Sequence, residues 1–126
     1  PHVDPEIFTW GVPILGICYG CQLIAHTLGG RVTEAQDDSA REYGKTETYF
    51  DSACKLFKGL PAQGITWMSH GDYMEKVPEG FALVAHSDAC PNVAICDESR
   101  GFYGVQYHPE VNHTEHGTDM IRNFLY

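Results

Sequence analysis

Apolar runs separated by glycine and proline predict alternating strands and helices along this chain. The stretch VPILGI (12–17) is short, continuously apolar and partly β-branched, which indicates a buried strand of the parallel type. After a tight turn, CQLIAHTLGG (21–30) places Leu23, Ile24, Thr27 and Leu28 at helical spacing and ends at a glycine pair suited to a helix C-terminus.

The remainder of the chain is richer in strands than in helices. The closing stretch GTDMIRNFLY (117–126) carries an apolar stripe typical of an amphipathic helix. Because strands outnumber helices after residue 30, a regular strand–helix alternation fits poorly. We therefore predict an α/β fold with an open mixed sheet and few, flanking helices. The further strand-like stretches are KTETYF (45–50), ITWMS (65–69), FALVAHS (81–87), NVAICD (92–97) and FYGVQYH (102–108).

Composition narrows the classes of function. The 126 residues suit one domain, and 8 Lys and Arg against 17 Asp and Glu give a net charge of −9. This balance argues against a nucleic-acid surface and against an anionic membrane surface. No apolar run is long enough to span a bilayer and no signal peptide is visible, but the chain begins at Pro1 rather than methionine, so we expect a fragment. The odd number of cysteines, five, favours a reducing, cytoplasmic location.

The octet GICYGCQL (16–23) holds two cysteines three positions apart. A buried strand that ends in Gly-x-Cys-x-Gly and passes directly into a helix is typical of a nucleophile elbow, with Cys18 in place of serine. Gly16 and Gly20 would remove side chains that clash in the turn. The helix start should favour the thiolate form of Cys18 through its N–H groups and partial positive charge.

Two other interpretations of the cysteine pair stay open at this point. A thioredoxin-like redox couple also sits at a helix start, although it usually lacks the flanking glycines. A zinc site needs a second pair of ligands at a recognisable spacing, and HTEH (113–116) is the only candidate in the sequence. We predict no metal site, and we interpret Cys54, Cys90 and Cys96 as small buried hydrophobic residues.

A cysteine nucleophile requires a base, and YHPEV (107–111) offers one. Pro109 pushes His108 towards extended backbone, in which residues two apart point to the same side. His108 and Glu110 therefore project together, and the carboxylate can orient the imidazole. From the residues alone, a loop histidine beside a solvated glutamate is an equally good interpretation.

Three motifs taken together resemble the class I (triad) glutamine amidotransferases. GICYGCQL, MSHGD (68–72) and GVQYHPEV (104–111) occur in the order and at distances similar to those of that family. The resemblance implies a flavodoxin-like enzyme domain that hydrolyses the side-chain amide of glutamine and passes ammonia to a synthetase. It implies Cys18 as nucleophile, His108 as general base and acid, and Glu110 as its orienting partner, and it leaves Cys21 as a packing residue.

The resemblance also implies substrate contacts. Gln22 matches a glutamine that helps to hold the substrate, although an exposed helix residue is the simpler interpretation without the match. The segment Ser69, His70, Gly71 and Asp72 matches the loop that meets the amino-acid end of glutamine, and without the match it is a strand-terminating turn. Asp72 could attract the α-ammonium group.

One departure from the family concerns the oxyanion hole. The family's domain begins with further strands and a Gly-Gly-Pro loop that supplies one backbone donor, and residues 1–17 contain no match to it. We therefore expect residues 1–126 to be the C-terminal two-thirds of an amidotransferase domain. The backbone N–H of Tyr19 is the remaining donor, and loss of one donor typically costs about 10²–10³ in rate.

Finer features resemble the branch of the family whose synthetase aminates XMP to GMP. Tyr19 stands where most relatives carry leucine, and REYGK (41–45), WMSHGD (67–72) and HPEVNHTEHG (108–117) are similar to that branch. This implies no cofactor in the present domain, with ATP and Mg²⁺ used by a partner synthetase on the same chain or a separate subunit. The alternatives are another class I amidotransferase, a γ-glutamyl peptidase or related cysteine hydrolase, and a non-catalytic module that keeps the fold.

Overall fold

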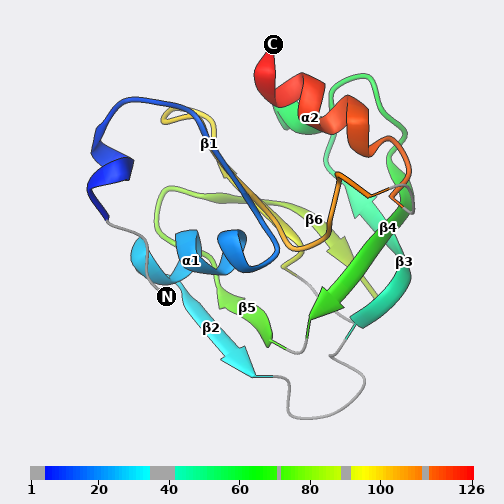
Figure 1. The fold of residues 1–126 in the computed structure, drawn as a ribbon, viewed down its shortest axis with the longest axis horizontal. Coiled ribbons are helices and arrows are strands. Elements are labelled where there is room, and N and C mark those ends of the chain that lie inside the picture. Colours follow the sequence, from blue (N-terminus) through cyan, green and yellow to red (C-terminus); the bar gives the residue numbers. More distant parts are fainter. Residues whose placement is uncertain (1–4, 35–41, 71, 89–91, 112–113) are drawn as a thin grey trace.

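The computed structural model describes residues 5–34, 42–70, 72–88, 92–111 and 114–126. Within these ranges the chain forms a six-stranded sheet, a two-stranded sheet and two α-helices, together with the short 3-10 helices η1 (Pro5–Thr9) and η3 (Lys55–Phe57) (Figure 1). No described helix combines the length and the apolar character needed to cross a membrane.

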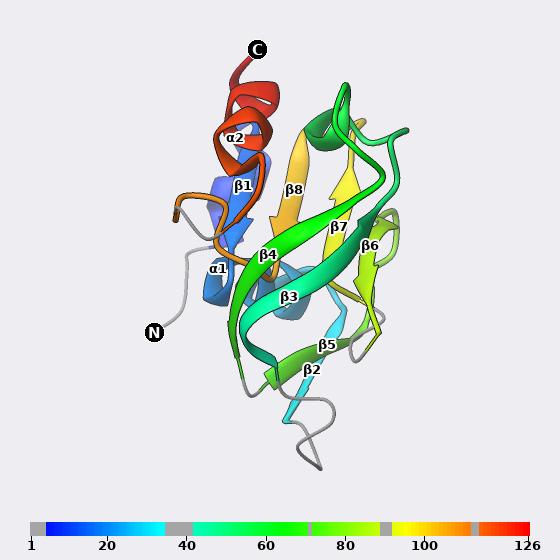
Figure 2. The same ribbon diagram turned by 90° about the vertical axis from the view of Figure 1, so that its right-hand side faces the viewer.

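The six-stranded sheet is mixed, as the sequence predicts. Its first two neighbours, β1 and β8, run parallel, and every other neighbouring pair is antiparallel (Figure 2). The parallel pair needs a long connection, and here residues 18–101, about two thirds of the chain, lie between the two strands. In spatial order the strands are β1 (Ile14–Ile17), β8 (Phe102–Val105), β7 (Ala94–Asp97), β6 (Ala82–Ser87), β3 (Glu42–Phe50) and β4 (Gln63–His70).

The second sheet was not predicted from the sequence. It pairs β2 (Arg31–Glu34) with β5 (Asp72–Lys76) in antiparallel fashion. The sequences RVTE and DYMEK contain few apolar residues, so neither shows the pattern of a buried strand. Val32 and Met74 nevertheless supply apolar side chains to the small core beneath this sheet.

Helix α1 (Tyr19–Thr27) follows β1 directly and packs against the sheet. Cys21 and Ala25 on this helix are completely buried and lie with Ile95 in one apolar cluster. A side chain at Gly104 would bring its Cβ to 2.8 Å from the Cys21 sulfur, so the helix approaches β8 as closely as it does because position 104 has no side chain. The predicted helix is confirmed, and its buried face includes Cys21.

Helix α2 (Gly117–Leu125) closes the larger core at the other end of the molecule, as Figures 1 and 2 both show. Met120 is buried and its sulfur accepts a hydrogen bond from the Tyr107 hydroxyl at 3.0 Å. The Asn123 amide donates to the carbonyls of Leu56 and Lys58, which ties α2 to the segment around η3. The predicted C-terminal amphipathic helix is therefore confirmed.

Candidate active site

Cys18 occupies the strained turn between β1 and α1. Its φ of 53° and ψ of −107° lie in a region that residues with side chains rarely adopt, and only His116 shares a positive φ among the described non-glycine residues. Two hydrogen bonds hold the turn: the Cys18 N–H donates to the Val105 carbonyl at 2.7 Å, and the Gln22 N–H donates to the Cys18 carbonyl at 3.2 Å. The strand–turn–helix arrangement expected of a nucleophile elbow is present.

The two glycines of the elbow differ in what they allow. A Cβ at Gly16 would lie 2.7 Å from the main chain of Gly20 and 2.6 Å from Ile24 Cδ1, so a side chain cannot be accommodated there without movement. A Cβ at Gly20 would meet no atom within 4 Å. The expectation that both glycines relieve clashes is correct for Gly16 and wrong for Gly20.

The environment of the Cys18 thiol opposes ionisation. Burial raises the pKa of this thiol above its ordinary value, and the backbone hydrogen bond from Tyr19 lowers it by less. The negative charge of Glu110 raises the pKa further, which also shows that Glu110 lies within electrostatic range of the sulfur. The expectation of a net shift towards thiolate is therefore wrong, and a nucleophile at this position needs a base to remove its proton.

His108 and Glu110 form the pair that the sequence predicts. Nδ1 of His108 lies 2.9 Å from Oε2 of Glu110, and both side chains are partly exposed. With Nδ1 engaged by the carboxylate, Nε2 is the nitrogen left to exchange a proton with a thiol or with substrate. Because Ile17 pairs with Val105 in the parallel register, Cys18 and the segment leading to His108 leave the sheet at the same end.

The loop that carries His108 is fastened to the free edge of β4. The His108 N–H donates to the Trp67 carbonyl at 3.0 Å, and the Thr114 hydroxyl donates to the His108 carbonyl at 2.6 Å while accepting the Trp67 N–H at 2.8 Å. Glu115 adds two more bonds to Ile65, one through its main chain and one through its carboxylate. Thr114 is buried. Its role could not be predicted from the sequence, because a threonine that follows HPEV gives no indication that its hydroxyl bonds to both His108 and Trp67.

The structure describes some of the predicted substrate residues more fully than others. Gln22 is largely buried one helical turn after Cys18, so it is not the exposed helix residue of the simpler interpretation. Ser69 and His70 end β4 and Asp72 begins β5, but their side chains and all of Gly71 lie outside the described part of the structure. The main chain of this segment continues directly from Trp67, which holds His108.

The segment that leads to His108 contains a buried side chain whose polar atoms are unpaired among the described residues. Gln106 is completely buried two residues before His108, and neither polar atom of its amide has a hydrogen-bond partner among the described residues. An unpaired buried amide is costly, so this position suits an internal water molecule.

The competing interpretations of the cysteines find little support. Cys18 and Cys21 are both free thiols, and Cys21 is fully buried against the sheet, which agrees with a packing role. In HTEH, Glu115 accepts the Ile65 N–H and His116 lies 3.6 Å from Asp119, so these two side chains serve other contacts. His113 and Cys90 lie outside the described residues.

Comparison with known proteins assigns the family. The sequence matches the family Glutamine amidotransferase class-I over residues 1–126. The chain belongs to the class I glutamine amidotransferases. This confirms the resemblance carried by the three motifs.

Individual relatives of this amidotransferase chain are named as GMP synthases or glutamine amidotransferases. It is 55% identical over all of its 126 residues to the GMP synthase [glutamine-hydrolyzing] of Clostridium perfringens, of which it covers 24%. The crystal structure of a protein assigned as one subunit of a GMP synthase, from Thermoplasma acidophilum, superposes with a TM-score of 0.87 at 38% identity, over 94% of this chain and 58% of that one. A glutamine amidotransferase from Thermotoga maritima gives 0.76 at 26% identity, over 95% and 48%. These structures confirm the predicted fold class, and the chain spans about a quarter of the length of the curated relatives it matches.

Proposed function

We propose that this amidotransferase chain is the glutaminase part of a GMP synthase, and that residues 1–126 are the C-terminal two-thirds of its amidotransferase domain. The observation that carries the proposal is the His108–Glu110 pair at 2.9 Å, at the same end of the sheet as the strained Cys18. The 55% identity to a protein named GMP synthase [glutamine-hydrolyzing] supports this branch over a γ-glutamyl hydrolase or another amidotransferase.

The first half of the reaction forms a thioester. His108 removes the proton from the Cys18 thiol, and the sulfur attacks the side-chain amide carbon of glutamine. The C–N bond then breaks, His108 delivers the proton to the leaving nitrogen, and ammonia departs from a γ-glutamyl thioester. Glu110 keeps the imidazole oriented and stabilises its protonated form.

The second half releases glutamate. His108 takes a proton from water, the hydroxide attacks the thioester carbon, and the C–S bond breaks as the proton returns to sulfur. In both halves the backbone N–H of Tyr19 stabilises the oxyanion, a role supported by its hydrogen bond to the Cys18 thiol. By the motif match, we also propose that Gln22 helps to hold the glutamine substrate, that residues 69–72 meet its amino-acid end, and that Asp72 attracts its α-ammonium group.

The ammonia is the useful product, so the site needs a synthetase beside it. In the proposed enzyme a domain that uses ATP and Mg²⁺ aminates XMP to GMP, on the same chain or as a separate subunit. The amidotransferase chain itself requires no cofactor. The whole reaction belongs to purine nucleotide synthesis in the cytoplasm.

The test is the Cys18→Ala substitution in the full-length enzyme. This variant should fail to make GMP from XMP, ATP and glutamine, yet should still make GMP when an ammonium salt replaces glutamine. His108→Ala should behave in the same way, and Glu110→Ala should show a milder loss because it transfers no proton. Cys21→Ala serves as the matched control and should retain glutamine-dependent synthesis.

Two results would contradict the proposal. One is a Cys18→Ala enzyme that uses glutamine at the wild-type rate. The other is a folded Cys18→Ala enzyme that has also lost synthesis from ammonium. That result would mean that glutamine hydrolysis and amination are not carried out at separate sites. Hydrolysis of γ-glutamyl peptides without any amination of XMP would favour the hydrolase alternative.

A further inference from the structure

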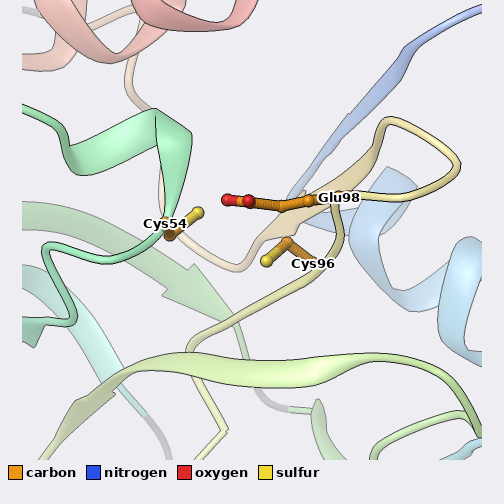
Figure 3. Close-up of side chains that lie close together, drawn as sticks. All are labelled: Cys54, Cys96 and Glu98. Atoms are coloured by element: carbon orange, nitrogen blue, oxygen red, sulfur yellow. The ribbon is translucent and has the colours of Figure 1, made fainter.

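Two cysteines and a glutamate converge at a place that the amidotransferase reaction does not use. Cys54 immediately precedes η3, Cys96 lies in β7, and Glu98 follows the end of β7. Their two sulfur atoms and a carboxylate oxygen all lie within 4.8 Å of one another (Figure 3). Cys96 and Glu98 are two positions apart, but Cys54 comes from a separate part of the chain, so no ligand spacing in the sequence reveals the cluster.

The cluster is buried at the sulfur side and open at the carboxylate side. Cys54 is 2% exposed and Cys96 is 5% exposed, whereas Glu98 is exposed. All three line a cavity of about 290 Å³, to which Asp51 and Asp97 also contribute. A small hydrated cation can therefore reach the sulfur atoms from solvent through an acidic opening.

The charges around the sulfur atoms favour a cation. Glu98, Asp97 and Asp51 line the same cavity as Cys54 and Cys96, so three carboxylate groups border the space beside the two sulfur atoms. A bound divalent cation would replace the thiol protons and would place positive charge where these acidic groups meet.

Supporting contacts orient the carboxylate ligand. Oε1 of Glu98 accepts the backbone N–H of Lys55 at 2.7 Å, which fixes the side chain over Cys54. Asp97 is engaged elsewhere, by the Ser99 hydroxyl at 2.6 Å and by Arg100. Asp97 therefore contributes charge, and Glu98 is the carboxylate available as a ligand.

We propose that Cys54, Cys96 and Glu98 bind a thiophilic divalent cation of the Zn²⁺ type, with water completing the coordination. Two sulfur ligands and one carboxylate suit Zn²⁺, whereas Mg²⁺ and Ca²⁺ are bound through oxygen alone. Tetrahedral Zn–S bonds of about 2.3 Å place two sulfur atoms roughly 3.8 Å apart, so donors already within 4.8 Å need only a small movement.

The site would be structural rather than catalytic. Cys96 pairs with Tyr103, towards the amino end of β8, whereas Cys18 leaves the sheet beyond Val105 at its carboxyl end. Asn123 joins α2 to the main chain around η3, so a metal bridge from Cys54 to β7 would also fasten the C-terminal helix. The proposal therefore stands independently of the proposed function.

The experiment is a Cd²⁺ titration of the reduced, metal-free protein under anaerobic conditions, followed by ultraviolet thiolate-to-cadmium charge-transfer absorption, with Zn²⁺ as competitor. A Cys18→Ser background removes the thiol of the candidate active site as a rival ligand. One equivalent of Cd²⁺ should produce the signal, Zn²⁺ should displace it, and Zn²⁺ should raise the midpoint of thermal unfolding. Cys54→Ser and Cys96→Ser should each abolish the signal.

Glu98→Gln keeps the test decisive if the cysteine variants do not fold, because position 98 is exposed. It should weaken Zn²⁺ binding at least about tenfold, the lower end of the loss seen when even a supporting partner is removed. Glu47→Gln, which alters an exposed carboxylate on β3, is its control and should bind Zn²⁺ as the parent does. The proposal is overturned if no one-equivalent signal appears with all thiols reduced, if the signal survives in Cys54→Ser or Cys96→Ser, or if Glu98→Gln binds Zn²⁺ as tightly as Glu47→Gln.

Discussion

The hydroxyl of Thr114 donates to the main-chain carbonyl of His108 at 2.6 Å. The same hydroxyl accepts the N–H of Trp67, so one buried side chain links the loop of the proposed base to the edge of the sheet. Thr114 touches no reacting atom in the proposed mechanism. It is a positioning residue, and its importance can be measured separately from that of the triad.

Replacing Thr114 by valine should lower both stability and turnover. The substitution keeps the shape but leaves the partly buried Trp67 N–H and His108 carbonyl without this partner, at a cost of about 1–3 kcal/mol in the free energy of unfolding. In the full-length enzyme, kcat with glutamine should fall while KM changes little and ammonium-dependent synthesis persists. Urea unfolding and steady-state kinetics give these values.

Thr9→Val is the matched control, because the Thr9 hydroxyl makes only an exposed contact with the Glu6 carbonyl. Its effect on stability should stay within about 0.5 kcal/mol. A Thr114→Val enzyme with unchanged kcat would show that the loop holds His108 in place without this hydroxyl.

The elbow glycines give an unequal pair of substitutions. Gly16→Ala forces a Cβ to within 2.7 Å of the Gly20 main chain, so it should destabilise the fold by about 1–3 kcal/mol and slow the alkylation of Cys18. Gly20→Ala enters open space and should leave stability nearly unchanged, since alanine also suits a helix better than glycine. Thermal unfolding of both variants checks this order, and equal losses would contradict the description of the turn.

The pH dependence of thiol alkylation tests the environment of Cys18. Because burial raises its pKa, the rate with iodoacetamide should still be increasing with pH above neutrality. Glu110→Gln removes a negative charge that raises this pKa, so the rate profile should move to lower pH even as glutamine hydrolysis falls. Mass spectrometry of the adducts should show Cys18 labelled before Cys21, Cys54 and Cys96, which are buried.

Tyr103 should make the fold sensitive to alkali. Burial raises the pKa of Tyr103 to about 12 from an ordinary value of 10.0, so the folded state favours the neutral phenol. The resulting stability is fully present below about pH 10 and is lost as the pH rises towards 12. The native chain should therefore lose unfolding free energy relative to a Tyr103→Phe variant as the pH rises across this range. Measuring the unfolding free energy of both proteins at each pH checks this.

The sequence predicted the parts of the fold in which local pattern and burial agree. The apolar run 12–17 correctly predicted the strand β1 and its parallel type, but β1 ends the described sheet and only its Gly16 is fully buried. His108 and Glu110 pair as predicted, although Pro109 and Glu110 lie in a turn rather than in extended backbone. β2 and β5 were not predicted, because both strands are mostly polar and their pairing with each other depends on the tertiary structure. The pKa of Cys18 was misjudged for a related reason, since burial depends on neighbours that the motif itself does not contain.

The parallel pairing of Ile17 with Val105 has a consequence for biosynthesis. During translation Cys18, the proposed nucleophile, leaves the ribosome before most of this stretch, whereas β8 and the proposed base His108 follow late in it. Contacts of such high sequence separation form slowly, because the entropy of closing a long loop is lost before the contacts stabilise the chain. The nascent chain therefore carries Cys18 through most of the synthesis of this stretch without its proposed base, and under the proposed mechanism no glutamine is hydrolysed until β8 has paired with β1.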